Sequence, residues 1–151
     1  MSTTLKQKLF TQASAFTALQ ALLGAPPAVF NWFDEQLDQN ALNSGNAAIV
    51  VKQLPRRPMW CNLGQLPTSF NRIQFTIYGA VSDPNAGADS QSCDAVVGAL
   101  QAFMPTFNAT GIGTPAPGNI LVSDIDGGIA ATQPRTFQRF VDYMIFANDN
   151  S

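Results

Sequence analysis

The stretch from Phe70 to Met104 limits the fold most, because its apolar residues change from the spacing of a strand to the spacing of a helix. Residues 70–78 alternate strictly, with apolar side chains on one face (Ile73, Phe75, Ile77) and polar or amphipathic ones on the other (Arg72, Gln74, Thr76, Tyr78). Residues 81–87 are rich in turn formers. A helical stripe follows, made of Cys93, Val96, Val97, Leu100, Phe103 and Met104. The sequence predicts a strand, a turn and an amphipathic helix that covers one face of a sheet.

The remaining elements follow from the same two spacings. One helix is predicted from Leu5 to Leu23, ended by Gly24 and two prolines. Strands are predicted over residues 29–33, 47–54, 119–125 and 137–147, and the strand over 119–125 is expected to end at Asp126-Gly127-Gly128. Residues 34–46, 56–68 and 105–118 are interpreted as loops. We therefore expect a single α+β domain over residues 1–151, with order α-β-β-β-α-β-β and two helices on one face of a mainly antiparallel sheet.

Charge is scarce in this chain. Charged residues make up 12% of it, about half the usual share of roughly 25%. Such a surface either consists of uncharged polar groups or lies partly against other subunits, since interfaces are depleted in charge. The net charge is −2 and the one basic doublet is Arg56-Arg57. This charge pattern gives no basic footprint for nucleic acid.

The residues do not favour an enzyme. The chain has no histidine, which removes the commonest general base, and its two cysteines, Cys61 and Cys93, form no metal-binding pattern. Asp124 and Asp126 are the nearest candidates for a carboxylate pair, but a turn-forming Asp-Gly-Gly is the favoured interpretation. We expect no enzymatic activity, cofactor or metal. No signal peptide and no apolar run of about 20 residues is present, so we expect no membrane contact and a reducing cytoplasm.

The layout resembles the family of siphophage tail-completion or tail-terminator proteins, which sit at the head-proximal end of a long non-contractile tail. The features that carry the resemblance are, in chain order, Leu22-Leu23-Gly24, Val29-Phe30, Ile49-Val50-Val51, residues 72–79, the helix over 88–103 with Asp94-Ala95-Val96, residues 120–126 and residues 139–146. They cover nearly the whole chain. They form a pattern of apolar positions without signature residues, and the segments 34–46 and 105–118 look longer than is usual in the family.

The resemblance implies a structural virion protein. Its expected form is a homohexameric ring that caps the tail tube, ends tube polymerisation and joins tail to head. The expected partners are other copies of the chain, the tail tube protein and a head-tail connector or stopper protein, with DNA only as passing cargo. Its expected location is the tail or neck of the virion, after assembly in the host cytoplasm.

Two loops supply the predicted subunit or tube interface: Arg56, Arg57 and Trp60 in the first, Phe107 and Ile112 in the second. The alternative for Trp60 and Phe107 is that they pack on their own core. Two other functions stay open. One is a different neck ring, such as a head-tail connector or stopper; the other is a monomeric or dimeric α+β domain with a small-ligand pocket.

Overall fold

The computed structural model describes residues 5–24, 30–38, 46–54, 57–61, 64–79, 90–107, 120–130 and 136–148. Side chains in the 57–70 stretch and at the ends of several elements are not described. The elements are, in chain order, α1 (Leu5–Ser14), α2 (Thr17–Leu23), β1 (Trp32–Asp34), β2 (Ala48–Gln53), β3 (Arg57–Cys61), β4 (Gly64–Tyr78), α3 (Ser90–Phe103), a 3₁₀ turn (Met104–Thr106), β5 (Ile120–Ala130) and β6 (Thr136–Asn148).

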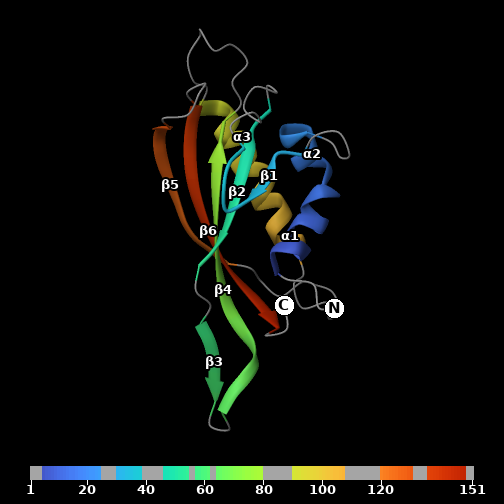
Figure 1. Cartoon of the computed structure of the whole chain (residues 1–151), viewed down its shortest axis with the longest axis vertical. Helices are drawn as coiled ribbons and strands as arrows, with labels where there is room; N and C mark the ends of the chain where they lie inside the picture. Colours follow the sequence, from blue (N-terminus) through green and yellow to red (C-terminus); the bar gives the residue numbers. More distant parts are fainter. Residues whose placement is uncertain are drawn as a thin grey trace.

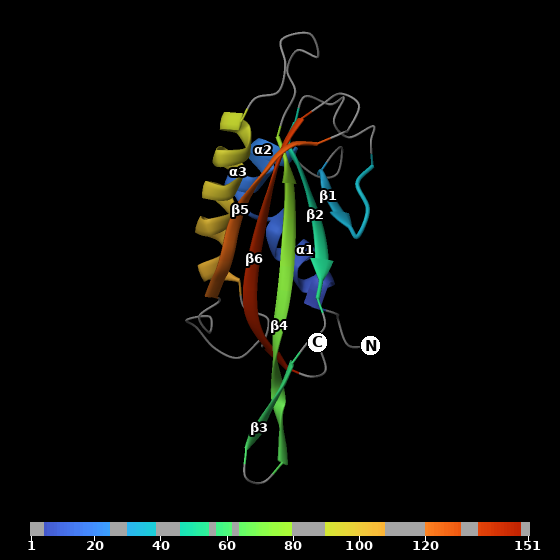
Figure 2. The ribbon, with the colours of Figure 1, turned by 90° about the vertical axis from the view of Figure 1, so that its left-hand side faces the viewer.

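The described strands form one mixed sheet in the order β1-β2-β4-β6-β5, with β3 paired to β4 off this path. β1 runs parallel to β2, and the other pairings are antiparallel. The α+β class and the mainly antiparallel sheet are therefore confirmed, although the element order differs. Figures 1 and 2 show the helices together on one side of the sheet and the β3–β4 hairpin projecting beyond it.

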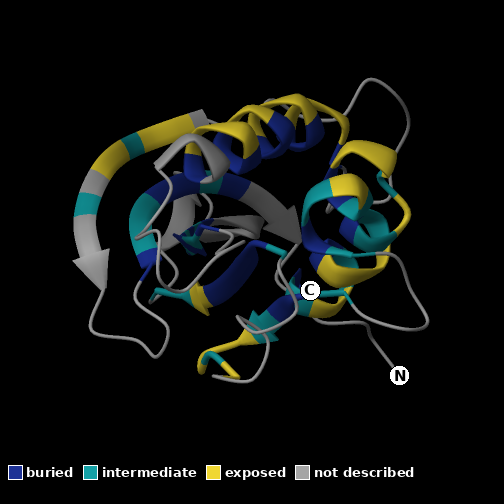
Figure 3. Ribbon diagram, turned by 90° about the horizontal axis from the view of Figure 1, so that it is seen from above, coloured by how far each residue is buried: buried dark blue, intermediate teal, exposed yellow. Residues whose placement is uncertain are grey.

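The core lies between the sheet and the helices. The alternation predicted for β4 holds, since Ile73, Phe75 and Ile77 are fully buried and the residues between them are half-buried. The helical stripe from Cys93 to Met104 is buried against them, and β6 adds Val141, Tyr143 and Ile145 from its position between β4 and β5. Figure 3 shows the buried sides of the helices turned towards the sheet. We call the sheet face that carries these residues the helix face, and the opposite face the far face.

The prediction of one continuous N-terminal helix over residues 5–23 is wrong. It is divided at Phe16, whose backbone is extended (φ −89°, ψ 115°) and which precedes the first turn of α2. Polar side chains satisfy the backbone at the break: Ser14 Oγ donates to the Thr11 carbonyl and Gln20 Nε2 donates to the Ser14 carbonyl. The predicted apolar face is retained on both helices by Leu5, Leu9, Ala13, Leu19 and Leu23.

Asn31 fastens the helical layer to the sheet. Its side chain is buried and donates to the carbonyl of Ala47, while its backbone N–H donates to the carbonyl of Leu23. Its own carbonyl accepts from the N–H of Ile49 in β2. One buried residue therefore joins the end of α2, the start of β1 and the start of β2.

The loop predicted over residues 56–68 is wrong, because most of it is the β3–β4 hairpin. Arg57 lies opposite Phe70 and Cys61 lies opposite Gly64, with a register shift between Pro58 and Trp60. The prolines indicated a loop, but proline is accepted on edge strands and at irregularities in pairing. β4 consequently extends over 15 residues, roughly 50 Å at the usual rise of a strand.

The strand end predicted at Asp126-Gly127-Gly128 is also wrong, because β5 continues to Ala130. Its register against β6 shifts between Asp126 and Ile129, so these glycines lie in a bulge and not in a chain-reversing turn. A Cβ at position 127 would lie 2.6 Å from Phe140 Cε2 and 2.8 Å from Gln138 Cγ. Close packing of the neighbouring strand therefore accounts for glycine at this position.

Candidate interaction surface

The predicted interface residues separate into three groups. Arg57 and Trp60 lie on β3, in the projecting hairpin, and their side chains are not described. Arg56 and Ile112 lie outside the described residues. Phe107 is 0% exposed and packs against Phe103, with ring centroids 6.0 Å apart. The interface role predicted for Phe107 is therefore corrected to a core role, because its side chain is on no surface.

The hairpin reaches past the rest of the sheet. Among the described residues β3 pairs with β4 alone, and the pairing of β4 with β6 ends at Thr68 opposite Asn148. Residues 64–67 of β4 are therefore flanked on one side by β3, and no described strand pairs with them on the other. Figure 1 shows this two-stranded arm extending from the body at the end away from the C-terminal end of β4. An isolated two-stranded ribbon is marginally stable in water, so this arm is a segment that a partner would stabilise.

β5 forms the other unusual surface. It is the outer strand of the sheet and carries three of the large apolar side chains that are exposed in the described chain: Leu121 at 42%, Val122 at 44% and Ile125 at 57%. Leu121 lies opposite Tyr143 on the helix face, whereas Ile125 lies opposite Phe140 on the far face. β5 is therefore apolar and accessible on both sides of its edge, which is typical of a strand that another chain covers.

An acidic cluster surrounds Arg139 beside β5. The Arg139 guanidinium donates to both carboxylate oxygens of Asp124, from Nε at 2.6 Å and from Nη2 at 2.8 Å, and its Nη1 donates to Asp94 of α3. Asp126 lies opposite Arg139 in the strand register. Two carboxylates thus pair with one guanidinium, and this edge keeps a negative balance that a basic partner would complement.

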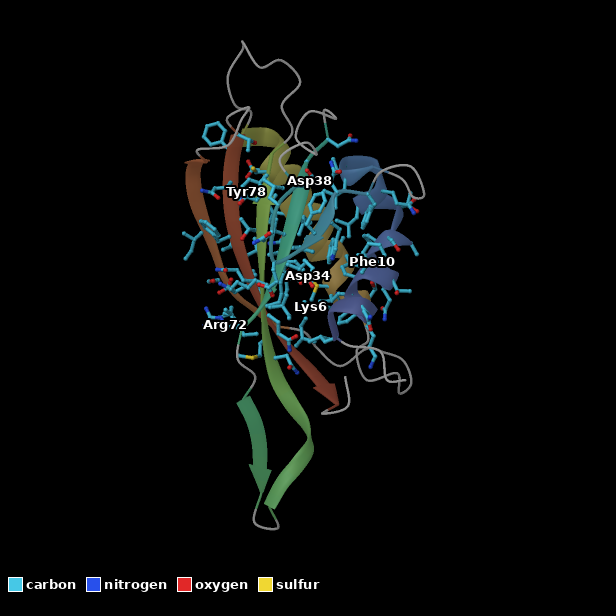
Figure 4. The ribbon with its side chains drawn as sticks, viewed as in Figure 1. Lys6, Phe10, Asp34, Asp38, Arg72 and Tyr78 are labelled. Carbon is cyan, nitrogen blue, oxygen red and sulfur yellow. The ribbon has the colours of Figure 1, made fainter. Side chains whose placement is uncertain are left out.

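The far face carries a polar row across four strands. Lys52, Gln74, Asp142 and Ser123 lie opposite one another in register on β2, β4, β6 and β5. Arg72 donates to Oδ2 of Asp142 from Nε at 3.1 Å and from Nη2 at 2.6 Å. Oδ1 of the same carboxylate is buried and, within the described part of the chain, accepts no hydrogen bond. Figure 4 places Arg72 on the side of β4 away from α1, and Tyr78 towards the other end of that strand.

A further ionic contact joins α1 to the end of β1. Lys6 Nζ donates to Asp34 at 2.7 Å and to Glu35 at 3.0 Å, and Figure 4 shows Lys6 and Asp34 close together. The hydrogen bond to Asp34 is the main reason that the pKa of Lys6 is raised. Glu35 has a φ of 70°, a left-handed conformation that is uncommon for this residue type. The contact fixes the chain where β1 ends, and all three groups are accounted for by this structural role.

An aromatic series runs from the surface to the core behind that contact. The half-exposed Phe10 ring makes a T-shaped contact with Phe30, and Phe30 stacks on Trp32. Trp32 then contacts Phe75 edge to face, and Phe75 contacts Tyr143 in the same way. The series packs α1 against the sheet and explains why a bulky aromatic remains partly exposed on α1.

Potential metal ligands in the regions that the structure describes bear on the expectation that the chain holds no metal ion. No group of three or more histidine, cysteine, aspartate or glutamate side chains is placed there to hold a metal ion. Cys93 is buried and its thiol donates to the carbonyl of Phe137. No helix among these residues is long and apolar enough to cross a membrane.

Sequence reasoning placed interface residues in the hairpin segment and predicted the strand that became β5, but it did not identify β5 as an interaction surface. The position of β5 at the edge of the sheet depends on pairing that no local pattern contains. One signal was available, since Asp124 and Asp126 within a strand are typical of an edge. Comparison with protein-family models and with curated proteins gave no match for this chain.

Proposed function

We propose that this protein is a structural component of a siphophage virion, a tail terminator that forms a ring on the tail tube, ends tube polymerisation and joins the tail to the head. The observation that carries the proposal is the pair of unlike surfaces on one chain, the projecting β3–β4 hairpin and the apolar edge of β5. A cyclic ring needs two such different patches, because each subunit presents one patch to the neighbour before it and the other to the neighbour after it.

Two further features support this function. The low share of charged residues suits a chain whose surface is largely covered by other subunits and by the tube. The buried side chains described here serve one core between helices and sheet, and the polar contacts found are structural ones. The resemblance noted in the sequence assigns the ring to the head-proximal end of a tail.

The test combines the mass of the protein in solution with a capping assay. We expect light scattering after size exclusion to give the mass of six subunits, and negative-stain images of that fraction to show rings. We also expect the rings to shorten tubes when they are added during polymerisation of the purified tail tube protein, with an equal amount of bovine serum albumin as control.

Three results would contradict the proposal in different ways. Tubes of unchanged length in the presence of rings would favour another neck component, such as a connector or stopper. A monomer that leaves tube growth unchanged would remove the ring function. A monomer that binds a small molecule saturably would favour a ligand-binding domain.

A further inference from the structure

The β3–β4 hairpin and the β5 edge each lack a neighbouring strand among the described residues. The hairpin is a two-stranded ribbon with no described strand beside residues 64–67, so it lacks the third strand or packed layer that stabilises a ribbon. β5 has an outer edge without a described partner and is apolar on both faces. Figures 1 and 2 show that the hairpin of a chain projects away from its own β5, so contact between the two would have to come from separate copies.

The regular part of the β5 edge is short. Its register against β6 shifts between Leu121 and Ser123 and again between Asp126 and Ile129, which leaves residues 123–126 in uninterrupted pairing. Bulges of this kind oppose pairing with a long, flat strand. β3 has five residues and is itself irregular against β4. Among the described strands β3 pairs with β4 alone, so its outer edge is also open, and a strand of this length fits the uninterrupted part of β5.

The charges of the two segments have opposite signs. Between residues 53 and 71 the charged residues are Arg56 and Arg57, and between residues 119 and 130 they are Asp124 and Asp126. Arg139 already pairs with Asp124 and Asp94, so the cluster beside β5 keeps an excess of carboxylates. Two hairpins would repel each other, as would two β5 edges. The charges therefore favour a contact between the hairpin of one copy and β5 of another over a contact between two hairpins or between two β5 edges.

We propose that the β3–β4 hairpin of one copy packs along the outer edge of β5 of the next copy and brings the basic start of β3 at Arg57 beside Asp94 and Asp124, the carboxylates that pair with Arg139. The contact joins unlike patches, so its repetition generates a ring or an open filament according to the rotation between neighbours. This inference rests on the proposed function only for the closure of the ring, since the contact itself concerns two copies of the chain.

The chain carries a cysteine suited to the test, because Cys61 ends β3 whereas Cys93 is buried. We expect Val122→Cys to give disulfide-linked chains under mild oxidation by copper phenanthroline, with Cys61 joined to the introduced cysteine in the peptide map. Adding Cys61→Ser should abolish that bond. Phe10→Cys is the matched control, because Phe10 on α1 is 45% exposed, as Val122 is at 44%, but lies off β5.

The contribution of the opposite charges to the contact is tested in the Val122→Cys variant. We expect Arg56→Glu with Arg57→Glu to lower the yield of the Cys61 bond to Val122→Cys at least tenfold and to weaken ring closure while the circular dichroism spectrum is unchanged. Lys52→Glu, which reverses an exposed basic residue on β2, should leave the yield unchanged. Linkage no greater in Val122→Cys than in Phe10→Cys would overturn the contact.

The outcomes separate this contact from the proposed function. Cys61 linkage without rings or tube capping would retain the contact and remove the tail-terminator proposal. Rings that cap tubes without any Cys61 linkage would retain the function and overturn the contact.

Discussion

At the scale of the residue, the far face depends on one carboxylate that is almost completely enclosed. The Asp142 side chain is 6% exposed, and the Arg72 side chain that donates to it is 43% exposed. Burial of an ionised carboxylate is costly unless hydrogen bonds compensate for the lost water. Arg72 gives two such bonds to Oδ2, and Oδ1 receives none from the described residues. Asp142 therefore relies on a single partner.

Removing that partner should destabilise the fold. We expect Arg72→Met to lower the free energy of unfolding by about 1–3 kcal/mol, the usual cost of leaving a buried acceptor unsatisfied. Urea denaturation followed by tryptophan fluorescence measures the change. Adding Asp142→Asn should recover part of the loss, because a neutral amide costs less to bury than a carboxylate. An Arg72→Met variant as stable as the parent chain would show that the ion pair contributes nothing.

The two tyrosines make stability sensitive to alkaline pH. Burial raises the pKa of Tyr78 and of Tyr143 above the ordinary value of 10.0, and for Tyr143 the charge of Asp124 acts in the same direction. Above pH 10 the unfolded chain releases these protons while the folded chain retains them. The unfolded state then binds fewer protons, so the free energy of unfolding falls as pH rises from about 10 towards the folded-state pKa values and is unaffected below that range.

Tyr143→Phe should reduce this alkaline loss, and Tyr78→Phe with Tyr143→Phe should reduce it further. The measurement is the free energy of unfolding in urea at intervals from pH 8 to pH 11.5. The raised pKa of Lys6, which comes first from its hydrogen bond to Asp34, adds a loss over the same range that all variants share. An equally steep fall in the double variant would assign the alkaline sensitivity to other groups.

At the scale of the element, local patterns predicted what depends on local sequence. The faces of β4 and α3 follow from alternation and from helical spacing, and residues such as Phe75 and Leu100 are buried as predicted. The break at Phe16 was missed because the apolar stripe continues across it, so the spacing alone does not distinguish one helix from two. Helix continuity there is decided by hydrogen bonds of Ser14 and Gln20, which the stripe does not report.

The misread strands share a different cause. Pro58 and Pro67 favoured a loop, and Asp126-Gly127-Gly128 favoured a turn, because these residues disrupt regular pairing. Pro58 in β3, Pro67 in β4 and the glycines in β5 lie in or near stretches where pairing is irregular or at an edge, and there the disruption costs little. Edge and bulge positions depend on neighbouring strands far away in sequence. The predicted interface therefore included Arg57 and Trp60 but not Leu121, Val122 or Ile125.

At the scale of the whole molecule, the described chain consists of a body and an arm. The body contains the core between helices and sheet, to which β4 contributes from Ile73 onward. The arm is the part of the β3–β4 hairpin that extends beyond the last β4–β6 pair at Thr68. A fold of this form separates the residues that determine stability from those available for assembly.

This separation predicts that the arm can be removed without unfolding the body. Pro58 lies opposite Ser69, so replacing residues 59–68 by Asn-Gly joins two paired positions through a favoured hairpin turn. We expect the urea midpoint and the m-value to change little, because m follows the surface exposed on unfolding and the core is intact. We also expect the shortened chain to be monomeric by light scattering. A large drop in the midpoint would mean that the arm belongs to the folding unit, and rings formed by a stable shortened chain would mean that assembly uses another surface.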